Sequence, residues 1–289
     1  MVDFLESRVK FFHCHGNLAN TPCDIWGKES VGLIELKTYL SNDELLQKYK
    51  WGFLNCLSDQ MFRIFVRLLQ LNNAEMQDRF SIGQGLNLTK SSIQGSGKNR
   101  VPYFTSDKGA CCSWTVSQSY VDKGLVNDDR KIPQLILPRG IGTHFCCRNE
   151  IKGYTSSFVE IYSEDCKEDE VLSVWLFCNS SLLWLLREYS GRTNLGGGML
   201  KAEATDLKLL PLYFNFPDKS VIRQIYARAK TYVVPSKIEE ALSAQLHRDI
   251  DSIVFRSLGI QDSENMVRKE LIRKFNSRMA KSKTTRKAK

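Results

Sequence analysis

Residues 177–214 read FCNSSLLWLLREYSGRTNLGGGMLKAEATDLKLLPLYF, and the rest of the chain is organised around this segment. Residues 179–181, Asn-Ser-Ser, carry side-chain oxygens that can accept hydrogen bonds at the start of a helix. Residues 182–186, LLWLL, are apolar on more than one face, which predicts a buried helix. Gly191 suits the left-handed position that ends many helices, and the glycines at 196–198 leave the backbone without Cβ atoms. The segment therefore predicts a buried helix followed by a break that can lie close to another surface.

A short strand and a turn complete the segment. The apolar pattern resumes at Leu200, and Thr205 or Asp206 can cap a turn. Pro211 ends the strand pairing because proline has no backbone N–H.

This order of elements resembles the C-terminal, DNA-reading part of adenine-specific DNA methyltransferases of the TaqI-like and fused type IIG kinds. It resembles the type I restriction specificity subunits more distantly. The matching residues of the segment are Asn179, Ser180, Ser181, Gly191, Arg192, Gly196, Gly197, Gly198, Asp206, Leu207 and Pro211. A glycine-rich loop after a core helix of any α/β protein is the alternative interpretation of these residues alone.

Further stretches match the same families in the same order, from about Trp51 to Pro211. They are an expected strand over 80–86 that contains Gly83 and Gly85, a strand over 132–138 between two prolines, and a strand over 156–161. After Pro211, the phrase RDIDSIVFRSLGIQDSE at 248–264 resembles the phrase that closes many of these methyltransferases.

The resemblance and the strand patterns together imply an α+β fold. We expect a mostly antiparallel β target-recognition domain flanked by helices, with a helical C-terminal section. The expected domains are an N-terminal connector of strands and helices over 1–75, the recognition domain over 76–216, a helical region over 217–275, and a basic flexible tail over 276–289. Residues 1–40 predict short strands and turns.

Apolar spacing predicts several helices outside the central segment. Residues 59–71 follow a cap signal at Ser58 and carry apolar side chains at helical spacing. Between 221 and 258, helical stripes are broken at Pro235 and stopped by Gly259. A last helix, capped by Asp262 or Ser263, carries Val267, Leu271 and Phe275.

The net charge of +9 is confined to the last quarter of the chain. From residue 217 to 289 there are 17 Lys and Arg against 8 Asp and Glu, whereas residues 1–216 are balanced at 24 of each. The last 16 residues hold seven Lys or Arg and little apolar surface. A frayed basic arm that tracks phosphate charge fits this pattern, and a solubilising tail is the alternative.

Three loops, over residues 90–100, 139–148 and 192–201, are the expected DNA contacts. They combine basic side chains with residues able to hydrogen-bond phosphates and base edges. Arginine suits a bidentate contact with guanine. The expected side-chain contacts are Lys90, Lys98, Arg100, Arg139, His144, Arg148, Arg192 and Lys201. The resemblance implies that Gly83, Gly85, Gly196, Gly197 and Gly198 let the backbone approach the duplex.

The nine cysteines form no CxxC pair, so we expect neither a structural zinc module nor any other metal site. Their odd number and the acidic start of the chain fit a reduced cytoplasm. No apolar run reaches the roughly 20 residues that cross a bilayer, so no membrane partner is expected.

Catalytic motifs of the resembled family are missing. Adenine methylation needs a base flipped out of the duplex and a [D/N/S]PP[Y/F/W] tetrapeptide to hold it, yet no two of the seven prolines are adjacent. The FxGxG strand and loop for the cofactor is also missing. We therefore expect no catalytic, cofactor-binding or metal-binding residues in this chain, with S-adenosylmethionine bound by a separate catalytic methyltransferase subunit.

The expected function is a specificity subunit or fragment of an adenine-specific methyltransferase or restriction-modification system, whose partners are double-stranded DNA and the catalytic subunit. The helices from 221 onward would bind that subunit, the DNA backbone, or both. Two alternatives remain open. One is a divergent methyltransferase that is active by itself, and the other is a non-catalytic RNA-binding or structural protein.

Overall fold

The structure is a computed structural model that describes residues 58–71, 79–86, 100–104, 118–122, 126, 129–156, 158–192, 199–208 and 210–287. The chain divides into two compact units, residues 1–70 and 71–289. Helix α5 (Asp59–Leu71) ends the first unit, as its sequence predicted. The Ser58 hydroxyl accepts a hydrogen bond from the Met61 N–H at 3.3 Å and so caps this helix. The elements expected before residue 58 lie outside the described part of the chain.

A four-stranded antiparallel sheet forms the centre of the second unit. Its strands are β1 (Phe80–Gln84), β8 (Phe158–Ser163), β4 (Leu135–Pro138) and β6 (Cys147–Arg148), in that spatial order. All four residues of β4 are buried, which agrees with a continuous apolar run between two prolines. The strands expected at 80–86, 132–138 and 156–161 are thus confirmed within their cores.

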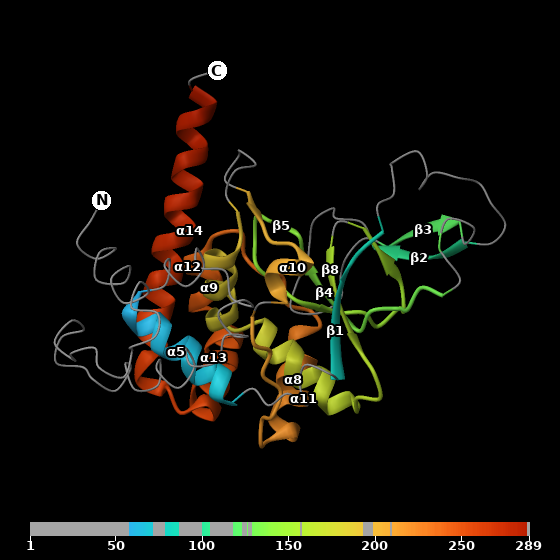
Figure 1. The fold of residues 1–289 in the computed structure, drawn as a ribbon, viewed down its shortest axis with the longest axis horizontal. Coiled ribbons are helices and arrows are strands. Elements are labelled where there is room, and N and C mark those ends of the chain that lie inside the picture. The colour runs from blue at the N-terminus through green and yellow to red at the C-terminus, as the bar shows by residue number, and fades with distance from the viewer. Residues whose placement is uncertain are drawn as a thin grey trace, which may run out of the picture. The chain divides into compact units, whose positions relative to one another are not determined.

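Two smaller sheets complete the β structure. In the first, β2 (Arg100–Phe104) pairs with β3 (Gln118–Asp122) antiparallel and with β7 (Tyr154–Thr155) parallel. In the second, β5 (Gly140–Ile141) pairs antiparallel with β9 (Leu200–Lys201). Within this unit, β2 and β3 lie at the opposite end from the C-terminal helix, while β5 lies between the two ends (Figure 1).

Two consecutive buried helices pack beside the sheet, and only the second was predicted. Helix α8 (Glu168–Cys178) has three acidic residues in its first turn, and α9 (Ser181–Ser190) begins at Ser180, whose hydroxyl accepts from the Leu183 N–H. Every residue from Val171 to Tyr189 is buried. Within the described chain no single helix has the length and apolar composition to cross a bilayer, and α8 and α9, bent by 64°, pass that test only as a pair.

The C-terminal section is helical, as expected. It contains α11 (Lys219–Ala229), α12 (Ile238–Ser243), α13 (Gln245–Leu258), the 3₁₀ turn η4 (Gln261–Ser263) and α14 (Glu264–Lys287). A further short helix, α10 (Ala204–Leu207), follows β9. Gly259 has φ 69° and ends α13 in the left-handed region, which favours glycine. The chain therefore has the α+β fold with antiparallel strands and a helical C-terminal section that its sequence predicted.

Two local predictions were wrong. Gly191 is extended, with φ −78°, so a left-handed conformation is not the reason for this glycine. A Cβ at this position would lie 2.7 Å from Leu200 Cγ, so the residue is small because β9 packs against the end of α9. In addition, the tail expected to be flexible from residue 276 continues as helix α14 to Lys287.

A buried carboxylate joins the helical section to α9. Asp251 of α13 is fully buried, and its Oδ1 accepts a hydrogen bond from the Ser181 N–H at 2.8 Å, so it caps α9 from a distant part of the chain. Burial raises the pKa of Asp251 to about 7, although the Ser181 N–H and the charge of Arg268 oppose the shift. This interaction was not predicted, because the two residues are 70 positions apart.

The raised pKa predicts how Asp251→Asn changes stability with pH. The unfolded carboxyl loses its proton near pH 4, whereas the folded one keeps it until pH reaches about 7. Between these values the folded state binds more protons, so this group lowers stability as pH rises. The asparagine can still accept the Ser181 N–H but carries no proton to lose. Its stability relative to the wild type should increase by about 1.4 kcal/mol per pH unit across this window.

Urea unfolding at about pH 4.5, 5.5 and 6.5 measures this difference. Asp249→Asn, two residues away on the same helix and partly exposed, is the matched control for the loss of a carboxylate from α13. A difference between wild type and Asp251→Asn that stays constant with pH would contradict the buried cap.

Candidate nucleic-acid interface

The pairing of β5 with β9 brings two of the expected DNA-contacting loops together. The Ala202 N–H donates to the Arg139 carbonyl at 2.9 Å, and Arg192 and Lys201 exchange backbone hydrogen bonds of 2.8 Å each. Arg139, Arg192 and Lys201 therefore converge from positions far apart in sequence. We call these three residues, with Glu203, the β5–β9 edge.

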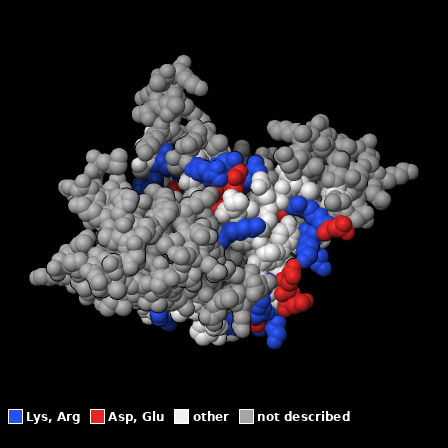
Figure 2. Space-filling model, viewed as in Figure 1, with Lys and Arg blue, Asp and Glu red and all other residues white. Residues whose placement is uncertain are grey.

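Two carboxylates, Glu203 and Asp206, partly neutralise the cations of the β5–β9 edge, and Asp206 Oδ2 lies 3.8 Å from Arg192 Nη2. Glu203 Oε1 lies 2.6 Å from Lys201 Nζ, and Glu203 Oε2 lies 3.3 Å from Arg192 Nη2. The hydrogen bond from Lys201 does most to lower the pKa of Glu203, and Arg192 and Arg139 add to the effect. The side chain of Arg192 is 53% exposed, so it can still reach a ligand. Figure 2 shows blue Lys and Arg next to red Asp and Glu at the upper centre of this face, where Figure 1 draws β5.

Buried residues in and next to the two strands pack together on the protein side of the β5–β9 edge. Ile141, Leu200 and Ala202 form a small buried cluster. Beneath it, the fully buried Arg187 donates from Nη2 to the Pro138 carbonyl at 2.6 Å, directly before Arg139. Burial lowers the pKa of Arg187 to about 10. A buried guanidinium bonded to this carbonyl holds the backbone at the point where Arg139 leaves the sheet.

Arg187 is incompletely satisfied. Its Nε and Nη1 groups have no hydrogen-bond partner in the described structure, which is costly for buried donors. Sequence reasoning missed this residue, because nothing in the pattern of α9 separates a buried arginine from a surface one.

Behind the edge lies a buried hydrogen-bonded network of His144, Glu188 and Arg278, in which Glu188 and Arg278 form an ion pair. Arg278 donates to both Glu188 oxygens, at 3.0 and 2.7 Å, and to the Ile141 carbonyl at 3.0 Å. His144 Nε2 lies 2.7 Å from Glu188 Oε1. Burial would raise the pKa of Glu188, but the bonds to His144 and Arg278 lower it to about 2. The network joins α14, α9 and β5.

The structure removes His144 from the expected DNA contacts. Its side chain is 0% exposed and stacks on Trp184 with ring centroids 5.6 Å apart. Desolvation, helped by the charges of Arg187 and Arg278, lowers the pKa of His144 even though Glu188 opposes the shift. A neutral, fully enclosed imidazole supports the fold and does not reach a base or a phosphate.

The remaining expected contacts are not part of the β5–β9 edge. Arg148 lies on β6 of the central sheet and pairs with Glu168 at 2.6 Å, and Arg100 is exposed at the start of β2. At Gly83 a Cβ would lie 2.9 Å from the Tyr162 ring, and at Gly85 it would lie 2.6 Å from Thr155 Oγ1. Packing against neighbouring strands of the same protein thus accounts for both glycines. Lys90, Lys98, Gly196, Gly197 and Gly198 lie outside the described residues.

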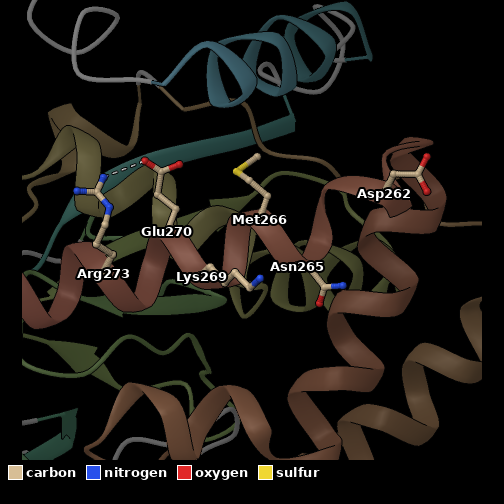
Figure 3. Close-up of a pocket in the computed structure, with 6 residues that line it drawn as sticks. All are labelled: Asp262, Asn265, Met266, Lys269, Glu270 and Arg273. Carbon is tan, nitrogen blue, oxygen red and sulfur yellow. Dashed lines mark hydrogen bonds and ion pairs between the residues drawn. The ribbon is translucent and has the colours of Figure 1, made fainter.

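A pocket of about 610 Å³ opens beside the first turns of α14 (Figure 3). Its described lining comes from η4 and α14 alone, and Arg273 points to Glu270, with which it pairs at 3.2 Å. The lining residues are Asp262, Asn265, Met266, Lys269, Glu270 and Arg273. We do not assign the interface to this pocket, because no described side chain from the sheets or from the other helices lines it.

No group of metal-binding side chains occurs in the described ranges. The four cysteines within them, Cys146, Cys147, Cys166 and Cys178, are free thiols, and only Cys166 is not buried.

Comparison with known proteins gave no identification. A scan against models of protein families found no match, and a search of curated proteins found no similar sequence.

If the β5–β9 edge contacts duplex DNA, as the sequence predicts, Glu203→Gln should strengthen that contact. The amide keeps the size of the side chain but removes the negative charge that Lys201 and Arg192 now neutralise. We expect affinity for a duplex to rise roughly 3- to 10-fold at low salt, and the salt dependence to steepen by about one released counterion. Fluorescence anisotropy with a labelled duplex measures both quantities.

Glu164→Gln is the matched control, because Glu164 is exposed and pairs with Lys131 away from the edge. If both variants change affinity equally, general charge rather than the β5–β9 edge governs binding.

Proposed function

We propose that this chain is the DNA sequence-recognition part of an adenine-specific DNA methyltransferase or restriction-modification system. In this proposal the chain binds duplex DNA and presents it to a separate catalytic subunit, which carries S-adenosylmethionine. The main supporting observation is the convergence of Arg139, Arg192 and Lys201 on the paired strands β5 and β9. Two loops that the sequence suggested independently thus form one basic surface.

The chemistry of this edge suits the reading of a duplex. An arginine guanidinium can donate two parallel hydrogen bonds to guanine O6 and N7, whereas a lysine acts on phosphate as a point charge. Arg139 directly precedes the strand pair, and the buried Arg187 holds the backbone next to it by donating to the Pro138 carbonyl. A side chain on a rigid support loses little conformational freedom on binding, which favours base discrimination.

The assignment of catalysis to another subunit is based on the whole sequence. Without adjacent prolines the chain lacks the tetrapeptide with which the resembled enzymes hold the flipped adenine. The buried carboxylates of the described chain serve structural partners, as Glu188 does with Arg278 and Asp251 does with Ser181. Bacterial restriction-modification systems act on DNA inside the cell, so we also propose a cytoplasmic location, which suits free thiols.

Co-purification and a methyl-transfer assay test the division of labour. The tagged chain, isolated from its native cells, should bring down a protein that contains [D/N/S]PP[Y/F/W]. The complex should methylate adenine in duplex DNA, and the chain alone should not. Methyl transfer by the chain alone would overturn the proposal.

Arg139→Ala should relax sequence recognition more than it weakens binding. Loss of one base contact costs about 1 to 3 kcal/mol of discrimination at one base pair. Sequencing of methylated sites in DNA treated with the complex would then show one degenerate position. Lys131→Ala, on an exposed lysine paired with Glu164, is the control and should leave the site unchanged. An unchanged site with Arg139→Ala would remove this residue from the reading surface.

A further inference from the structure

Helix α14 becomes strongly basic toward its C-terminal end. The last acidic residue of the chain is Glu270, and residues 271–289 contain eight Lys or Arg and no Asp or Glu. The helix itself continues to Lys287. This part of the chain is therefore a positively charged helix over most of its length, and not the frayed arm that composition alone suggested.

The first half of α14 is firmly attached to the rest of its unit. Val267, Leu271 and Phe275 form a buried stripe at helical spacing. Lys274 Nζ lies 3.8 Å from the centroid of the Tyr189 ring, and the Tyr189 hydroxyl donates to Glu270. The helix packs along α9 through these contacts.

Arg278 is the last of these attachments and also bonds to strand β5, next to the β5–β9 edge. It is 5% exposed, pairs with Glu188, and donates to the Ile141 carbonyl. Ile141 is the residue of β5 that pairs with Leu200 of β9. Arg278 thus ties α14 to strand β5, which begins directly after Arg139 and pairs with the strand that carries Lys201.

The C-terminal end of α14 projects past the other described helices and strands of its unit (Figure 1). Nine further residues to Lys287 add about 13 Å of helix, which is close to four phosphate spacings along one DNA strand. Four cations occur in this length: Lys281, Lys283, Arg286 and Lys287.

We infer that α14 beyond Arg278 is a rigid contact for the phosphate backbone of duplex DNA. This inference rests on the proposed function and adds to it: the β5–β9 edge reads bases, while the end of α14 supplies sequence-independent affinity at a fixed distance from that edge. Phosphate contacts position a protein on a duplex and base contacts discriminate. The two tasks are divided between two elements that Arg278 joins.

The composition of the helix end favours a duplex over other polyanions. A helix that binds a membrane surface needs a large apolar face, but residues 280–287, AKSKTTRK, contain no large apolar side chain. Binding of single strands uses aromatic side chains on which bases stack, and no aromatic residue follows Phe275. A helix end that is rich in cations and has neither feature suits a continuous phosphate backbone.

Removal of the four charges tests the inference. The variant Lys281→Ala, Lys283→Ala, Arg286→Ala, Lys287→Ala keeps strong helix-forming residues, so the helix should persist. The dissociation constant for a labelled duplex of random sequence is measured from about 50 to about 200 mM salt. Helical spacing puts Lys283, Arg286 and Lys287 on one side of the helix, so we expect the slope of log K against log salt to become shallower by about 2 to 3, and binding at the low-salt end to weaken at least about tenfold.

The control variant removes the same number of charges elsewhere in the unit. It replaces Lys131, Lys230, Lys237 and Arg248, which are all exposed, with alanine. Its salt slope should change by less than about one. Equal slopes for both quadruple variants would overturn the inference.

Ala280→Pro separates a rigid helix from a flexible charged tail. Proline in the helix interior breaks the helix after Arg278 and leaves every cation in place. The rigid contact predicts at least threefold weaker duplex binding, with Ala280→Ser as the control that should bind like the wild type. Wild-type affinity in Ala280→Pro would overturn the fixed geometry.

The outcomes also separate this inference from the proposed function. If the wild type binds duplex DNA without sequence preference and the four-alanine variant loses the salt slope, the inference stands and the recognition proposal fails. If the wild type reads a sequence and the slope is unchanged, only the inference fails. Absence of duplex binding by the wild type, or the same slope loss with single-stranded RNA, overturns the inference.

Discussion

One buried ion pair, between Glu188 of α9 and Arg278 of α14, holds together the elements that form the candidate interface in the second unit. Loss of either partner would leave a buried charge unpaired, at a cost of about 3 to 5 kcal/mol. The pair does more than stabilise, because Arg278 also bonds to the Ile141 carbonyl of β5 and Glu188 also bonds to His144. A single guanidinium therefore joins the C-terminal helix, the central buried helix and the strand pair of the candidate interface. The backbone of α14 is therefore tied, at Arg278, to the strand pair of the candidate interface.

Local physical chemistry accounts for what the sequence predicted. Ser180 caps α9, Gly259 ends α13 with a positive φ, Val267 and Leu271 line the buried side of α14, and β4 lies between two prolines. Each of these patterns involves neighbours within a few residues. Helix α8 was missed because it is apolar on nearly all sides from Val171 onward, so it shows no periodicity, and the three acids of its first turn were the available signal.

The unpredicted features involve partners far apart in sequence. Glu188 and Arg278 are 90 positions apart, and a buried arginine cannot be told from a surface one by composition. For this reason His144 was expected at the surface and Arg278 in a flexible tail. Gly191 was correctly marked as unusual, but the cause is its contact with Leu200 and not its backbone conformation. In the candidate site, the sequence identified Arg139, Arg192 and Lys201 separately, whereas their convergence and their neutralisation by Glu203 required the pairing of β5 with β9.

We propose that this polypeptide selects a duplex sequence without performing chemistry on it. Enrichment from a random duplex library tests this proposal. The isolated chain is mixed with the library at physiological salt, and bound duplexes are recovered and sequenced over several rounds. The account predicts that one short motif becomes enriched, and that a library of single-stranded RNA yields none. A bound pool with the same base composition as the starting library, at a salt concentration where binding persists, would contradict the account.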